Sequence, residues 1–285
     1  MKIKIGLTVL MVLIASILPD LLFASPYVTA AKLAILAAGA LLFLMIRALR
    51  PLWKLSAVLL TINVAFWVSS LIRHASWWQQ LYVDIGFFAD VAGSVFVKII
   101  GIVPVAAVML LVMKNPQNCY LSPGILSIRS GSIVWLGIRG GQIRWGRLAV
   151  VSGVLIMIGT VLLSMITTTG FFVPAGFDRL IRNLPLILLL AVVNSFCEGL
   201  VFRSAVMGPI RDIFSKLFVT LMPACFFGIA HYQGIPGGFL GAALSGLLGY
   251  YMSLSMYETR GFLSGWIIHV MQDIAVFSTL ALMGT

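Results

Sequence analysis

The sequence predicts an all-α protein built as a polytopic transmembrane bundle of about eight or nine helices. Of its 285 residues 61% are hydrophobic and only 9% are charged, which is more apolar surface than a soluble domain of this size can bury. Several apolar runs approach the ~20 residues needed to cross a hydrocarbon core of ~30 Å. Lipid offers no hydrogen-bond partner to open strand edges, so these spans are expected to be helices.

Nine apolar segments are the predicted spans. They cover residues 5–24, 27–46, 52–72, 92–113, 148–168, 185–207, 214–232, 237–256 and 262–283. The first has the basic start and apolar stretch of a signal peptide. The charge pattern favours a retained anchor, and without it eight spans remain.

Lys and Arg are distributed unevenly among the predicted loops. With the N-terminus placed in the cytoplasm, fourteen of the nineteen, including Arg203, fall on the cytoplasmic side and five, including Lys98, on the other. This bias orients membrane helices, so it predicts that the N-terminus is cytoplasmic. We expect the chain to be an integral protein of a bacterial cell (inner) membrane. It also explains the net charge of +11 without a nucleic-acid partner. The three cysteines form no CxxC pair and are too few for a disulfide framework.

The chain divides into three predicted parts. Residues 1–113 form an N-terminal transmembrane half of about four spans, and 148–285 form a C-terminal half. Residues 114–147 between them are rich in Gly and Arg, with Trp135 and Trp145 interleaved. Beside a membrane this composition indicates an interfacial cytoplasmic linker that contacts anionic lipid headgroups.

Ionisable groups lie away from the ends of three predicted spans in the last hundred residues. Charged groups are costly in lipid and usually mark a functional site. The sixth span carries Glu198, the seventh His231, and the ninth His269 and Asp273. An acid and two imidazoles on three helices can satisfy one another only inside the bundle.

Helical spacing extends this cluster. Asn194 lies four residues before Glu198 and therefore shares its face, as His269 shares that of Asp273. Single residues have simpler explanations: an intramembrane histidine can be a helix–helix hydrogen-bond donor, and Arg203 can extend to the headgroups. The combination favours a site.

Three sequence elements carry a resemblance to a known family. They are Glu198-Gly199-Leu200-Val201-Phe202-Arg203, Phe227-Gly228-Ile229-Ala230-His231 and His269-Val270-Met271-Gln272-Asp273. Together they resemble the CPBP family of intramembrane proteases, which includes the CAAX-processing prenyl endopeptidases, over roughly residues 183–280. The family shows two adjacent glutamates before the arginine. Gly199 replaces the second glutamate here, which leaves the usual pairing of the arginine, and full activity, open.

The resemblance implies an intramembrane endopeptidase with a catalytic four-helix core at the C-terminal end of the bundle. Its substrate would be a membrane-embedded peptide or protein, lipidated or otherwise membrane-associated. We expect Glu198 to act as general base on a water shared with His231, with His269 and Asp273 positioning donors around the oxyanion. Asn194, Arg203 and Phe227 would support them, and the implied mechanism needs no metal or other cofactor.

Three alternatives remain open. Two His and two carboxylates are acceptable zinc ligands, although HExxH is absent from the sequence. The chain could be a non-catalytic scaffold or immunity component that kept the fold. It could also be a proton-linked transporter, but the sequence shows none of the paired repeats that transporters usually carry.

The predicted spans leave one geometric conflict. Glu198 lies near the middle of its span, whereas His231 falls at the outer end of the next, a mismatch of about 10 Å. Either that helix begins later and runs through Gly237, or Pro223 bends it.

Overall fold

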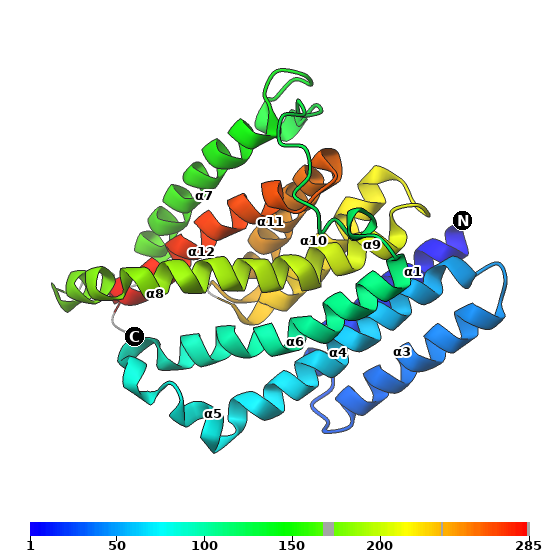
Figure 1. Ribbon diagram of the computed structural model, residues 1–285, viewed down its shortest axis with the longest axis horizontal. Helices are drawn as coiled ribbons and strands as arrows, with labels where there is room; N and C mark the ends of the chain where they lie inside the picture. Colours follow the sequence, from blue (N-terminus) through cyan, green and yellow to red (C-terminus); the bar gives the residue numbers. More distant parts are fainter. Residues whose placement is uncertain (168–173, 235, 284–285) are drawn as a thin grey trace.

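The computed structural model describes residues 1–167, 174–234 and 236–283, and these residues form an all-helical bundle (Figure 1). The α-helices are α1 (Lys2–Ala15), α2 (Leu18–Leu22), α3 (Val28–Met45), α4 (Trp53–His74), α5 (Ser76–Gln80), α6 (Ala89–Met113), α7 (Trp145–Thr167), α8 (Pro174–Glu198), α9 (Ala205–Ile210), α10 (Lys216–Ala230), α11 (Gly238–Thr259) and α12 (Leu263–Met283). Short 3₁₀ turns are η1 (Arg50–Leu52), η2 (Val83–Phe88), η3 (Pro116–Cys119), η4 (Val134–Leu136) and η6 (His231–Gln233). A π-helical turn, η5 (Gly199–Ser204), joins α8 to α9. The predicted all-α class is confirmed.

Within the described residues, seven helices are long and apolar enough to cross a membrane. They are Val28–Met45, Arg50–His74, Ala89–Met113, Trp145–Ile166, Gly176–Ile210, Gly238–Thr259 and Leu263–Met283. Their outward faces carry large exposed hydrophobic side chains, which suits contact with lipid. The chain is therefore an integral, polytopic membrane protein.

Two of the nine predicted spans are too short to cross by themselves. The first, 5–24, is broken because Ser16 adopts an extended conformation after α1, and the chain continues in the five-residue α2 with Pro19 in its first turn. The seventh, 214–232, becomes the fifteen-residue α10. At 1.5 Å per residue, α1 and α10 each extend only about 20–25 Å, which is less than the ~30 Å thickness of the hydrocarbon core. The α10 helix buries much of its apolar surface against other helices, whereas α1 buries only four residues.

The two halves of the chain pack into one bundle. The α12 helix packs against α7 and α8, α10 lies along α11, and α4 packs between α3 and α6 (Figure 1). The largest hydrophobic cluster joins residues of both halves, such as Leu59 and Met109 from the first and Phe227 and Met252 from the second. The α6 helix also contacts α8, which brings the N-terminal half to the segment that carries Glu198.

Three connections meet at one end of the bundle, which we call the polar end. They are the linker 114–144, the α9–α10 connection and the α11–α12 turn. The Ile125 amide donates to the Thr259 carbonyl (2.8 Å), the Phe262 amide to the Ser122 carbonyl (2.7 Å) and Arg211 Nη1 to the Gln117 carbonyl (3.1 Å). These are three of the connections that the charge pattern predicts on the cytoplasmic side. That orientation remains a prediction.

Candidate active site

Glu198 is the last residue of α8, at the start of a π-helical turn. The turn η5 covers Gly199–Ser204 and leads directly into α9, so that a single apolar span runs from Gly176 to Ile210. Wider π turns within helices often occur at functional sites, because the extra residue redirects the side chains. Here the turn begins directly after the acid and contains Arg203.

The shortness of α10 resolves the predicted mismatch in depth. This helix starts at the polar end with Lys216 and stops at Ala230, so His231 lies about 22 Å from its start. The span that carries Glu198 ends at the polar end with Ile210, and Glu198 lies about 18 Å from that residue along the helix. The two side chains are thus at similar depth. The predicted helix over 214–232 thus begins two residues later, at Lys216, and ends at Ala230 without running through Gly237.

Glu198, His231, His269 and Asp273 converge from three helices. One carboxylate oxygen of Glu198, Oε2, lies 3.5 Å from His269 Nε2 and 4.0 Å from His231 Nε2. His269 Nε2 is also 3.6 Å from Asp273 Oδ1. His269 and Asp273 are buried, whereas the His231 side chain is 31% exposed. All four predicted catalytic residues therefore meet.

Hydrogen bonds on the far side of each imidazole define which ring nitrogen carries the proton. Arg203 Nη2 lies 2.8 Å from His269 Nδ1, and a guanidinium only donates, so the neutral His269 ring has its proton on Nε2. His231 Nδ1 donates to the Phe227 carbonyl (2.8 Å), which leaves Nε2 as an acceptor in the neutral ring. His269 thus presents a hydrogen-bond donor to Glu198, whereas His231 presents an acceptor.

Arg203 belongs to the site and does not reach the headgroups. Its side chain is fully buried, and its guanidinium carbon lies 5.5 Å from the centre of the Phe227 ring. Arg203 and Phe227, both predicted to support the catalytic residues, therefore contact each other. Nε and Nη1 of Arg203 have no hydrogen-bond partner among the described residues.

A second acid at Gly199, as in the family pattern, would displace the side chains that now lie there. A Cβ atom placed there would come within 2.7 Å of Phe262 Cζ and 2.8 Å of Arg203 Nη2. The Phe262 ring and the arginine thus occupy the position of the missing side chain. The unmet donors of Arg203 are consistent with the loss of a carboxylate partner.

Lys98 of α6 completes the cluster, and the sequence interpretation missed it. Its Nζ lies 2.7 Å from Glu198 Oε1 and 2.5 Å from Asn194 Oδ1. Asn194 in turn donates from Nδ2 to Asp273 Oδ2 (2.9 Å). The assignment of Lys98 to the outer surface was therefore wrong. A lone ammonium inside the apolar run 92–113 was the available signal, because such a group is expected to find a buried partner.

Metal ligation has no clear candidate in the described part of the chain. No set of three or more His, Cys, Asp or Glu side chains there has an arrangement suited to hold an ion. Two cationic groups, those of Lys98 and Arg203, instead bond directly to Glu198 and His269.

The fold and the cluster together define an integral membrane protein with a buried acid–imidazole site. Residues 180–275 match the family model described as type II CAAX prenyl endopeptidase Rce1-like. This confirms the predicted resemblance to CAAX-type membrane proteases over about a third of the chain, which includes all four converging residues but not Lys98. The family is one of proteases, so the match supports a peptidase. No curated protein and no solved structure matches the chain.

Proposed function

We propose that this protein is an intramembrane endopeptidase that hydrolyses a peptide bond in a membrane-anchored or lipidated polypeptide. It would act in a bacterial cell membrane with its N-terminus in the cytoplasm. The observation that carries the proposal is the approach of Glu198 Oε2 to the Nε2 atoms of both His231 and His269, at 4.0 and 3.5 Å. The match to a protease family over the same residues supports it.

In the proposed reaction, Glu198 activates a water molecule. The water donates one hydrogen to Glu198 Oε2 and the other to the acceptor Nε2 of His231, so that an oxygen lone pair faces the substrate carbonyl. The carboxylate removes a proton as the water oxygen bonds to the carbonyl carbon. The 4.0 Å between Oε2 and Nε2 is too long for a direct hydrogen bond and suits a bridge through one water.

His269 would stabilise the oxyanion of the tetrahedral intermediate. Its Nε2–H points towards Glu198, and Arg203 fixes this tautomer through Nδ1. Preorganised donors of this kind are worth about 10²–10³ in rate. When the intermediate collapses, the C–N bond breaks and the proton held by Glu198 passes to the leaving amine.

The remaining side chains would position Glu198. Lys98 holds Oε1 and thereby directs Oε2 towards the imidazoles. Asn194 links Lys98 to Asp273, whose other oxygen lies 3.6 Å from His269 Nε2. We assign the role of fixing the His269 tautomer to Arg203 and not to Asp273.

The proposed reaction uses no metal. Lys98 already occupies one oxygen of Glu198, and a second cation at the same carboxylate would be repelled. The zinc alternative is tested by treating the purified protein with a chelator: loss of cleavage that zinc restores, with zinc found by elemental analysis, would overturn the metal-free assignment.

The decisive experiment compares the membrane proteomes of cells that carry the wild-type chain, Glu198→Gln or the control Asp178→Asn. Asp178 is exposed on α8 and lies outside the cluster, so its variant should behave as wild type. Glu198→Gln should accumulate an uncleaved membrane precursor, with cleavage reduced about 10²–10⁴-fold, because the amide cannot accept the proton. A folded Glu198→Gln protein with full cleavage would refute the assignment.

A non-catalytic scaffold or immunity protein is the second candidate. Two observations favour it: Gly199 stands in place of the second acid, and the ammonium of Lys98 is paired with the base. This candidate predicts the same membrane proteome for wild type and Glu198→Gln, so the experiment above separates the two functions.

A further inference from the structure

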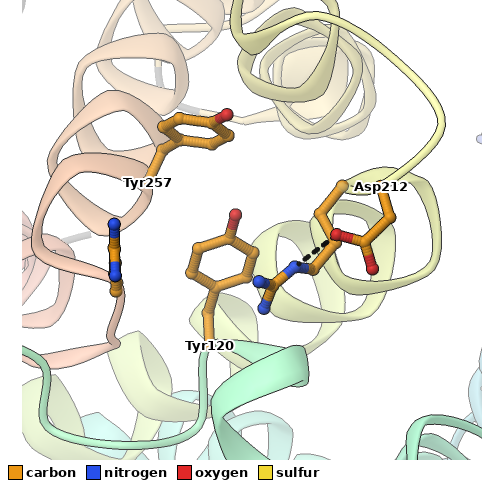
Figure 2. A pocket seen from close by; sticks show the side chains of 5 residues that line it. Tyr120, Asp212 and Tyr257 are labelled. Carbon is orange, nitrogen blue, oxygen red and sulfur yellow. Dashed lines mark hydrogen bonds and ion pairs between the residues drawn. The ribbon is translucent and has the colours of Figure 1, made fainter.

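A polar pocket lies at the polar end, and none of its lining residues belongs to the acid–imidazole site. It has a volume of about 340 Å³ and is lined by Tyr120, Arg211, Asp212, Tyr257 and Arg260 (Figure 2). The linker supplies Tyr120, and the end of α9 and the α11–α12 turn supply the arginines. Three segments distant in the sequence therefore build one pocket.

Arg211 is fixed in the wall of the pocket by bonds along one edge. Its Nε donates to Asp212 (3.2 Å), and its Nη1 donates to the Gln117 carbonyl (3.1 Å) and to Asn118 Oδ1 (3.3 Å). The guanidinium carbon lies 5.7 Å from the centre of the Tyr120 ring. Nη2 has no hydrogen-bond partner in the described part of the chain. The Arg211 guanidinium is therefore held in place while the N–H groups of Nη2 remain available to a ligand.

Three further groups in the pocket are donors without a partner. The Arg260 side chain makes no hydrogen bond or ion pair with any described residue, and neither the Tyr120 nor the Tyr257 hydroxyl makes a hydrogen bond there. The two tyrosine rings lie next to each other, 6.4 Å between centres, and Figure 2 shows Tyr120 pointing towards Tyr257. Burial raises the pKa of Tyr120 to about 12, so its hydroxyl remains protonated and can donate at physiological pH.

The charge of the lining favours an anion. Asp212 is the one acid among the five lining residues, its side chain is 77% exposed, and it is already paired with Arg211. Arg260 makes no ion pair with any acid that the structure describes. Two guanidinium groups and two hydroxyls are the donor set that suits the several oxygens of a phosphate group.

The position of the pocket indicates where that phosphate comes from. Arg211 directly follows Ile210 and Arg260 directly follows Thr259, the ends of two apolar spans. Residues at span ends lie at the depth of the lipid headgroups. Basic pockets between helix ends in this zone are suited to anionic headgroups.

We propose that this pocket binds the phosphate group of an anionic phospholipid. The volume accommodates a phosphate with part of the attached glycerol, since small-molecule pockets begin at about 300 Å³. The linker contributes Tyr120 directly, so a bound lipid would also hold the linker against α9 and the α11–α12 turn. This inference does not rest on the proposed protease function, because Glu198 lies about 18 Å further along its span.

The test measures binding of three probes to the full-length protein in detergent. The probes are short-chain phosphatidylglycerol, short-chain phosphatidylcholine and inorganic phosphate, followed by native mass spectrometry and by the shift in thermal unfolding. The first variant is Arg260→Gln, which removes a cation whose side chain pairs with no described residue. The second is the double variant Tyr120→Phe/Tyr257→Phe, which removes only hydroxyls. Arg139→Gln, an exposed arginine of the same linker, is the matched control.

Wild type should prefer phosphatidylglycerol over phosphatidylcholine. Arg260→Gln should weaken phosphatidylglycerol binding about tenfold, the double tyrosine variant should weaken it severalfold, and Arg139→Gln should leave it unchanged. Equal binding by wild type and Arg260→Gln would overturn the pocket assignment, and the same holds if Arg139→Gln weakens binding as much. If inorganic phosphate binds as tightly and displaces the lipid, the lipid assignment is overturned in favour of a soluble phosphate compound. None of these results depends on peptide cleavage.

Discussion

The two oxygens of the Glu198 carboxylate have different surroundings. Oε1 accepts from Lys98 (2.7 Å), whereas Oε2 faces the two imidazoles. Lys98 comes from α6, outside the stretch that matches the protease family. The N-terminal half therefore contributes a positioning residue to the proposed site in addition to its role in packing.

Replacing Lys98 tests this contribution. Lys98→Met should lower kcat about 10–100-fold with little change in KM, because a hydrogen bond to a charged group is worth ~1.5–3 kcal/mol and the freed carboxylate can rotate away from the water. Lys98→Arg should recover part of the loss, since it keeps the charge. Lys2→Met, at an exposed position, is the control. An unchanged kcat in Lys98→Met would show that the ion pair has no positioning role.

A side chain at position 199 would press on two neighbouring side chains. Gly199→Ala would place a methyl group against Phe262 and Arg203, and we expect a loss of about 1–3 kcal/mol in unfolding free energy from overpacking. Thermal unfolding of Gly199→Ala, Phe262→Ala and the double variant forms a double-mutant cycle. The double variant should lose less than the sum of the single losses. Additive losses would contradict the contact between these two positions.

At the scale of elements, the linker is held by one carboxylate of α11. Glu258 Oε2 accepts from Trp145 Nε1 (2.7 Å) and from the Gly131 amide (2.7 Å), while Oε1 pairs with Lys216. The bonds connect the linker, the start of α7 and the start of α10. The predicted interfacial linker is thus a folded segment with a defined place on the bundle.

Glu258→Gln should loosen the linker selectively. The amide lacks the charge that pairs with Lys216 and turns an NH₂ group towards donors, a loss of about 1–3 kcal/mol. Hydrogen–deuterium exchange should therefore rise in residues 122–145 and stay unchanged in α8. As a control, Asp178→Asn removes an exposed ion pair with Arg182 (3.8 Å) that stabilises the fold by only ~0–1 kcal/mol. It should change the exchange of neither the linker nor α8. Unaltered exchange in the linker of Glu258→Gln would contradict this role.

The elements also show what the sequence could predict and what it could not. The spacing from Asn194 to Glu198 and from His269 to Asp273 follows from helix geometry, so these pairs were predictable and they share faces as expected. Hydropathy could not reveal that α10 stops at Ala230, because a buried helix and a spanning helix are equally apolar. Lys98 pairs with a residue one hundred positions away, and local periodicity carries no information on such contacts.

For the whole molecule, packing places the connections between the spans at two opposite ends of the bundle, one of which is the polar end. The α6 helix is a full span, so the α5 segment before it and the linker after it emerge on opposite sides of the membrane. The charge bias predicts that the linker is cytoplasmic and α5 external. One accessible position at each end is enough to test this orientation.

Cysteine labelling of whole cells provides that test. Gln80→Cys at the end of α5 should react with a membrane-impermeant maleimide, and Arg139→Cys in the linker should react only after the cells are opened; both positions are exposed. The native Cys119 should contribute little background, because burial raises its pKa to about 11. At pH 7 only about one such thiol in 10⁴ is a thiolate, and that fraction grows as the pH rises towards 11. The wild-type chain measures the background directly. Labelling of Arg139→Cys in intact cells with protection of Gln80→Cys would reverse the orientation, and with it the leaflet from which the proposed phosphate pocket is filled.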